Sequence, residues 1–262
     1  MEFIINETDE ILVSHSGLAL AGAMLEQSPL RKRLNEICLG KRKRPEVPHG
    51  DVLTAMIGLL CLGKSDYADI EAYRQEEFFR RALGLKKLPS EETLRQRMDQ
   101  LGTTPIAILH EESARLIARH APALTACHDD WIPLDIDVSP FDNSGTKKEG
   151  VAWTYKKLDG YAPNFAYLGL EGYLVHCELR PGNQHCQDGT PEFLERAIDL
   201  ARQMTEGKLL VRMDAGNDDL DNLRILRKKK HVAWIIKRNL RKESEVEWLE
   251  EAQALGEWEE PR

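Results

Sequence analysis

The sequence has no apolar run long enough to cross a membrane and no segment laid out like a signal peptide. Its longest apolar stretch, residues 52–62, is interrupted by Thr54 and is far shorter than the roughly 20 residues of a membrane-spanning helix. The first residues, MEFI, lack the basic start of a secretory signal. We therefore expect a cytoplasmic protein with no membrane partner.

Cysteines are few, odd in number and widely spaced. The five are Cys38, Cys61, Cys127, Cys177 and Cys186, and no CxxC motif occurs. These features argue against a disulfide framework. Two adjacent His-Cys pairs, at 176–177 and 185–186, fit no common zinc-ligand spacing, so we interpret them as strand and loop residues.

The chain also lacks an excess of positive charge. Its 36 Lys and Arg residues face 44 Asp and Glu residues, which gives a net charge of −8 over 262 residues. This balance argues against a protein that coats nucleic acid with its whole surface, and it leaves room for local basic patches. Hydrophobic residues make up 42% of the chain, enough to build cores and to exclude disorder throughout.

Helical periodicity dominates up to about residue 125. Apolar residues recur at helical spacing in six stretches, and we expect helices over residues 17–25, 51–62, 66–73, 76–83, 91–101 and 105–120. Ser90 is placed to cap the helix over 91–101. We interpret residues 1–125 as an all-helical region for DNA binding or dimerisation.

Two groups of basic residues in this region are candidates for DNA contact. A basic block predicts contacts to phosphates, and we assign them to Arg31, Lys32, Arg33, Arg42 and Arg44. Arg95 and Arg97 lie on the polar side of a helix that follows a glycine-containing turn, as in a helix-turn-helix that reads bases. The alternatives are a solvated charged face and plain helical packing.

The period changes after residue 125. Apolar residues alternate in strand fashion over 131–139, with Leu134, Ile136 and Val138 on one face and acids on the other. Further strands are expected over 165–170, 173–179, 209–213 and 232–236, helices over 190–205, 220–230 and 245–255, and a loop over 142–160. The fold class is therefore α+β: an all-helical domain followed by a mixed α/β domain.

Two aspartates in the second part are candidate metal ligands. Asp214 follows a buried strand at its carboxyl end, where open α/β sheets bind ligands. Asp137 lies within a strand, and the two converge if their strands are neighbours. Carboxylate oxygens are ligands that Mg²⁺ or Mn²⁺ prefers. The alternatives are turn and cap chemistry for Asp214 and a solvent-facing position for Asp137.

Several segments resemble the DDE transposases of bacterial insertion sequences, and the IS-thirteen-eighty group most closely. In the second part these are residues 134–139, 147–150, Tyr155, 159–161 and 211–216; upstream they are residues 72–74 and 89–95. The resemblance covers nearly the whole chain. It implies a ribonuclease-H-like domain over residues 126–262 and Mg²⁺ or Mn²⁺ as cofactor.

The resemblance also assigns roles to acidic residues. It implies that Asp137 is the first catalytic acid and metal ligand, that Asp214 is the second, and that Asp135 is the second choice for the first position or a supporting metal ligand. The third acid, a Glu on a late helix, has no match. Nearby Glu243, Glu245, Glu247 and Glu250 lack the expected Tyr, Arg and Lys companions and are interpreted as a charged helix face. We therefore expect a domain truncated before its third acid, with the C-terminal part missing.

The function that the resemblance implies is DNA transposition by metal-dependent strand cleavage and transfer at transposon ends. The partner is then double-stranded DNA at those ends, and a homodimer is compatible with this function. Without the third acid we expect the chain to be inactive alone. The alternatives are a non-catalytic DNA-binding remnant that inhibits the full-length transposase and a stand-alone ribonuclease-H-like nuclease.

Overall fold

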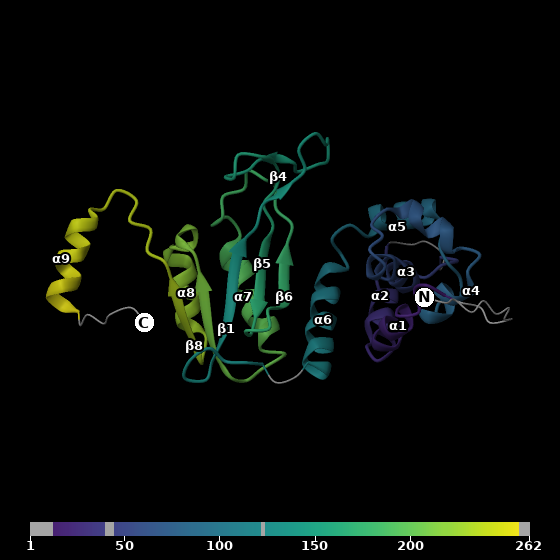
Figure 1. Cartoon of the computed structure of the whole chain (residues 1–262), viewed down its shortest axis with the longest axis horizontal. Helices are drawn as coiled ribbons and strands as arrows, with labels where there is room; N and C mark the ends of the chain where they lie inside the picture. Colours follow the sequence, from purple (N-terminus) through teal and green to yellow (C-terminus); the bar gives the residue numbers. More distant parts are fainter. Residues whose placement is uncertain (1–12, 40–44, 122–123, 257–262) are drawn as a thin grey trace, which may run out of the picture. The chain divides into compact units, whose positions relative to one another are not determined.

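The computed structural model describes residues 13–39, 45–121 and 124–256 (Figure 1). The chain forms two compact units, residues 1–116 and 117–262. The division between them falls within helix α6, Ile106–His120, whereas the sequence-based boundary at 125 comes after that helix. Within the described ranges, no helix is long and apolar enough to cross a membrane.

The first unit is helical. Its elements before α6 are α1 (Leu18–Glu26), α2 (Leu30–Asn35), α3 (His49–Cys61), the 3₁₀ helix η1 (Tyr67–Tyr73), α4 (Glu77–Ala82) and α5 (Glu91–Leu101). Helix α3 is central to the core and buries Val52, Ala55 and Leu59. The six expected helical segments are confirmed, one of them as a 3₁₀ turn, and α2 is an additional helix inside the basic block. Ser90 caps α5 by accepting a hydrogen bond from the Thr93 amide, as expected.

The second unit is built on a mixed five-stranded sheet (Figure 1). Its strands are β1 (Trp131–Val138), β5 (Asn164–Leu168), β6 (Tyr173–Glu178), β7 (Lys208–Met213) and β8 (Val232–Ile236), in the order β6-β5-β1-β7-β8. Strands β1, β5 and β6 pair in antiparallel fashion, whereas β7 lies parallel to both β1 and β8. The α+β class and the expected strands are therefore confirmed.

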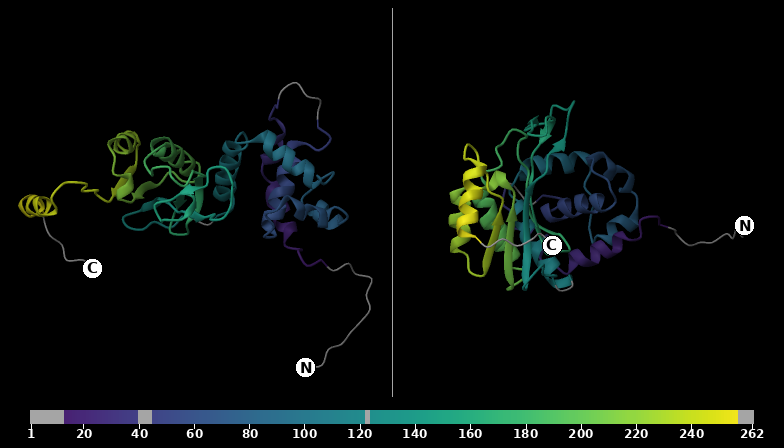
Figure 2. Two further views of the ribbon diagram at one scale, coloured as in Figure 1. Left: turned by 90° about the horizontal axis from the view of Figure 1, so that it is seen from above. Right: turned by 60° about the vertical axis from the view of Figure 1, so that its left-hand side comes forward.

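One face of this sheet carries the core. Helices α7 (Thr190–Ala201) and α8 (Leu220–Lys228) lie on the same side of the sheet when it is seen from above (Figure 2). Leu134 and Ile136 of β1 pack with Leu194 and Ile198 of α7, because alternation along a strand and helical spacing along α7 bring these apolar residues together. Helix α9 (Glu245–Leu255) follows β8 and matches the predicted range.

The prediction of a loop over residues 142–160 is wrong. A second sheet lies here, with strands β2 (Phe141–Asp142), β3 (Ala152–Trp153) and β4 (Asp159–Tyr161) in the order β2-β4-β3. Each strand has only two or three residues, which is too short to show alternation. Gly160 allows the close pairing, because a Cβ atom there would lie 1.9 Å from the Phe141 carbonyl oxygen.

Candidate active site

The two predicted metal-ligating aspartates lie side by side at the carboxyl edge of the main sheet. Strands β1 and β7 are parallel, and their last paired residues are Ile136 and Met213. Asp137 and Asp214 are the next residues on the two strands, so the strand pairing brings them together across 77 positions of sequence. Both side chains are exposed.

Each carboxylate keeps a free oxygen. Asp137 Oδ1 accepts from the amide of Val138 at 2.9 Å. Asp214 Oδ1 accepts from the Gly216 amide at 3.0 Å and from Asn217 Nδ2 at 2.9 Å, because Asp214 caps the 3₁₀ helix η2 (Ala215–Asn217). No described residue donates to Oδ2 of either aspartate or forms an ion pair with them. The pair therefore presents two negative charges without a compensating cation.

Asn217 is a site residue that the sequence analysis missed. Its side chain is almost fully buried and orients the Asp214 carboxylate through the hydrogen bond from Nδ2. Asn222 of α8 in turn donates to the Asn217 carbonyl at 2.9 Å and to Gln187 Oε1 at 2.8 Å. The available signal was an Asn three residues after the Asp, a spacing typical of a capped turn.

Asp135 lies on β1 in a different environment. The register places it opposite Arg212, and both of its oxygens accept from that guanidinium, Oδ2 at 2.6 Å from Nη2. Hydrogen bonding to Asp135 raises the pKa of Arg212. A bidentate ion pair uses one lone pair of each Asp135 oxygen and neutralises the charge that would attract a metal ion. The arrangement favours Asp137 over Asp135 as the first acid, and the metal role of Asp135 stays a prediction.

Tyr155 and Cys186 border the acid pair. The Tyr155 hydroxyl donates to the Val138 carbonyl at 3.1 Å, and Cys186 Sγ donates to the Gly216 carbonyl at 3.1 Å. Burial, followed by the charges of Asp137 and Asp214, raises the pKa of Tyr155. Burial and then Asp214 likewise raise the pKa of the Cys186 thiol. Both side chains therefore remain protonated and neutral at neutral pH.

The donor set fits a hard divalent cation. Two carboxylates with free oxygens suit Mg²⁺, which is bound in proteins through one or two carboxylates, several waters and substrate phosphates. Among the described residues, no group of three or more His, Cys, Asp or Glu side chains is arranged to hold a metal ion. A divalent cation bound at this edge would meet two protein carboxylates, and water and substrate would supply most of its coordination shell.

Comparison with known families gives a match along almost the whole chain. Residues 4–259 match the family described as "Transposase DDE domain group 1". The chain belongs to this family of DDE transposase domains. A comparison with curated proteins finds no match.

Solved structures give weaker matches. A piggyBac transposase synaptic complex with hairpin DNA matches with a TM-score of 0.35 and 11% identity, over 89% of this chain and 53% of that chain. The Mos1 transposase paired-end complex with the left transposon end matches with a TM-score of 0.26 and 11% identity, over 92% and 90%. The transposase domain described here therefore spans about half of the piggyBac chain. Because these TM-scores are low, the membership of the chain in the DDE transposase family depends on the family match.

Two of the basic residues predicted to contact DNA, Arg31 and Arg33, have partners inside the helical unit of the transposase domain. Arg31 donates to the carbonyls of Gly84 and Leu83, and Arg33 forms ion pairs with Glu111 at 2.7 Å and Glu112 at 2.6 Å. These contacts favour structural roles for both arginines. Arg42 and Arg44 lie outside the described residues.

The two arginines of α5 also have protein partners. Arg95 pairs with Glu92 one turn earlier, and Arg97 Nη1 lies 3.1 Å from Nδ1 of His49 in α3. The Arg95 pair is exposed, and such pairs contribute little to stability, so this side chain is free to exchange partners. Arg97 is half-buried against α3. Base reading by either arginine stays a prediction.

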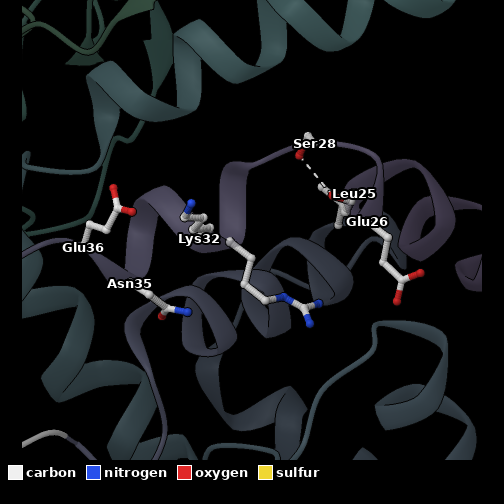
Figure 3. Close-up of a pocket in the computed structure, with 7 residues that line it drawn as sticks. Leu25, Glu26, Ser28, Lys32, Asn35 and Glu36 are labelled. Carbon is white, nitrogen blue, oxygen red and sulfur yellow. Dashed lines mark hydrogen bonds between the residues drawn. The ribbon is translucent and has the colours of Figure 1, made fainter.

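Lys32 is exposed and forms no ion pair within the described ranges. It borders an open hollow of about 510 Å³ on α1 and α2 (Figure 3). The lining carries both signs of charge and consists of Leu25, Glu26, Ser28, Arg31, Lys32, Asn35 and Glu36. Because two acids and two bases line it, this hollow does not favour a phosphate over other ligands.

Proposed function

We propose that the chain acts on DNA as a transposase of the DDE type and that its catalytic centre includes Asp137 and Asp214. The observation that carries this proposal is the placement of two unpaired carboxylates on adjacent parallel strands. Like charges side by side repel one another, and a bound divalent cation relieves that repulsion. Membership of the DDE transposase family supports the same chemistry.

The strand order supports a ribonuclease-H-like core for this centre. Three antiparallel strands in sequence order, followed by two strands added in parallel on the other side of β1, give the order β6-β5-β1-β7-β8. In this arrangement the first and fourth strands of the sheet are neighbours. The proposed acids are therefore brought together by the topology itself.

Each residue at the centre has a distinct task in the proposed reaction. Asp137 and Asp214 would hold Mg²⁺ or Mn²⁺ through their free oxygens, while Asn217 fixes the orientation of Asp214. Arg212 neutralises Asp135 and limits the negative charge that approaching DNA meets. When bound there, such ions would supply activation of a water or a 3′-hydroxyl and stabilisation of the leaving oxygen in phosphoryl transfer.

Manganese binding to the full chain tests the metal site. We expect weak binding of Mn²⁺, measured by electron paramagnetic resonance, because two carboxylates leave most ligands to water. Asp137→Ala and Asp214→Ala should each abolish it, whereas Asp135→Asn should preserve it as the matched control. Binding that survives both alanine substitutions would remove these residues from the site.

Nicking of supercoiled plasmid DNA tests catalysis separately. Nicking in Mn²⁺ that requires both Asp137 and Asp214 supports transposase chemistry in this chain. Manganese binding without nicking overturns catalysis by the chain alone and favours the alternative of a DNA-binding protein that inhibits the full-length transposase. The specific observation behind that alternative is that only two acids meet among the described residues.

A further inference from the structure

The loop between β3 and β4 is a rigid turn beside the acid pair. Thr154 is buried, and both its amide and its hydroxyl donate to the Leu158 carbonyl, at 2.9 and 3.0 Å. The Lys157 amide closes the turn by donating to the Thr154 carbonyl at 2.9 Å. Lys157 adopts a φ of 62°, a conformation that non-glycine residues rarely take. The two residues at the tip, Tyr155 and Lys156, are therefore held in a defined position.

The tip residues extend towards the proposed catalytic centre. Tyr155 is 64% exposed, yet its hydroxyl is anchored to the carbonyl of Val138, the residue after Asp137. Lys156 lies over the Tyr155 ring, with Nζ 5.3 Å from the ring centre. The Lys156 ammonium group thus lies beside the tyrosine whose hydroxyl is anchored next to Asp137.

Lys156 forms no ion pair with any described residue, and its one recorded contact is with the Tyr155 ring. A cation and a hydroxyl donor next to a proposed divalent-cation site are complementary to an anion that also binds the metal ion. A phosphodiester has this chemistry, because its non-bridging oxygens accept from Lys and Tyr and also coordinate Mg²⁺. A simple ion pair of Lys156 with either aspartate would satisfy the charges, but the structure contains none.

We propose that Tyr155 and Lys156 form a phosphate-binding element that holds the DNA backbone against Asp137 and Asp214. The proposal rests on the proposed function and adds a substrate contact to it. The rigid turn reduces the conformational entropy that is lost when the phosphate binds. Lys156 supplies charge, and Tyr155 supplies a directional hydrogen bond once its hydroxyl exchanges the Val138 carbonyl for a phosphate oxygen.

Binding of random-sequence duplex DNA to the full chain, without metal and over a series of KCl concentrations, tests this element. Lys156→Gln should lower the slope of log K against log salt by about 0.9, the value for one lost phosphate contact. Tyr155→Phe should weaken binding by roughly tenfold and leave the slope unchanged, because it removes a hydrogen bond to a charged group. Lys156→Arg keeps the positive charge and should therefore show the same slope of log K against log salt as the parent chain.

Lys208 provides a matched control. It is an exposed lysine that also lies over an aromatic ring, with Nζ 5.6 Å from the ring centre of Trp131, but it sits at the opposite end of β1. Lys208→Gln should leave both affinity and slope unchanged. Equal slopes for Lys156→Gln and Lys208→Gln would overturn the proposal. So would a Tyr155→Phe variant that loses thermal stability but binds DNA as tightly as the parent.

The two tests fail independently. Manganese binding is measured without DNA and depends on Asp137 and Asp214, whereas the salt series is measured without metal and depends on Tyr155 and Lys156. Suppose that Mn²⁺ binding does not depend on the two aspartates, but that Lys156→Gln still lowers the salt slope of DNA binding. Lys156 is then a DNA contact that does not serve metal-dependent catalysis.

Discussion

Replacing Arg33 with methionine is expected to destabilise the helical unit, because this arginine neutralises a buried acid. The Glu112 side chain on α6 is only 2% exposed, and its Oε1 accepts from both Arg33 and Arg115. Glu112 Oε2 is buried without a hydrogen-bond partner. Hydrogen bonds to Glu111 and Glu112 raise the pKa of Arg33, so its charge persists at every ordinary pH.

The magnitude follows from how much of the pairing is lost. Removing one partner of a fully buried ion pair costs about 3–5 kcal/mol. Here Arg115 remains beside Glu112, and the Arg33 side chain is 28% exposed. We therefore expect a loss of about 2–3 kcal/mol in the free energy of unfolding, close to one charged hydrogen bond plus part of the desolvation penalty.

Urea denaturation of the full chain, combined with hydrogen exchange of the amides in α2 and α6, measures this loss and locates it in the helical unit. Lys32→Met is the matched control, since it removes the neighbouring exposed charge, and it should change stability by less than about 0.5 kcal/mol. The reasoning is refuted if Arg33→Met is as stable as Lys32→Met and instead shows a selective loss of DNA affinity, which would make Arg33 a phosphate contact.

Two further changes test the energetics of each unit. Burial raises the pKa of Asp51 in α3, so the folded state keeps the carboxyl proton of Asp51 to higher pH than the unfolded chain does. The free energy of unfolding therefore falls as the pH rises from about 3.8 through the raised pKa. Asp51→Asn should remove that fall and raise the urea midpoint at pH 7, and a midpoint that stays the same or drops would contradict the assignment. Asn222→Ala in α8 should cost about 2–3 kcal/mol in thermal or urea unfolding, because it leaves the buried Asn217 carbonyl without its donor. A loss below about 0.5 kcal/mol would show that water replaces that donor.

The main elements of the fold could be predicted because they depend on short-range patterns. Alternation over β1 places Leu134 and Ile136 in the core, and helical spacing does the same for Leu194 and Ile198 of α7. The small sheet could not be predicted, since its strands are too short to show a period. Its existence depends on Gly160, whose lack of a side chain permits a contact that only the folded chain reveals.

Partners of long charged side chains could not be predicted from the sequence. A basic block predicts phosphate contacts only if its charges are free, and the folded chain supplies acids from distant positions. Arg33 meets Glu112, which lies 79 residues away, and Arg97 meets His49, which lies 48 residues away. Lys32 and Arg33 are neighbouring cations in the same basic block, and the sequence does not tell their roles apart. Of the two, only Arg33 forms ion pairs with described residues.

The choice between Asp135 and Asp137 shows most directly what strand register adds. Both aspartates lie on one strand, two residues apart, and therefore on the same face, so no local pattern separates them. The parallel register sets Asp135 opposite Arg212, which neutralises it, and brings Asp137 next to Asp214, which does not. Placing two carboxylates together costs electrostatic energy, and no cation among the described residues pairs with either of them to offset it. A register shifted by two residues would bring Asp135 next to Asp214 instead, so the pairing of β1 with β7 decides which aspartate stands beside Asp214 without an ion pair.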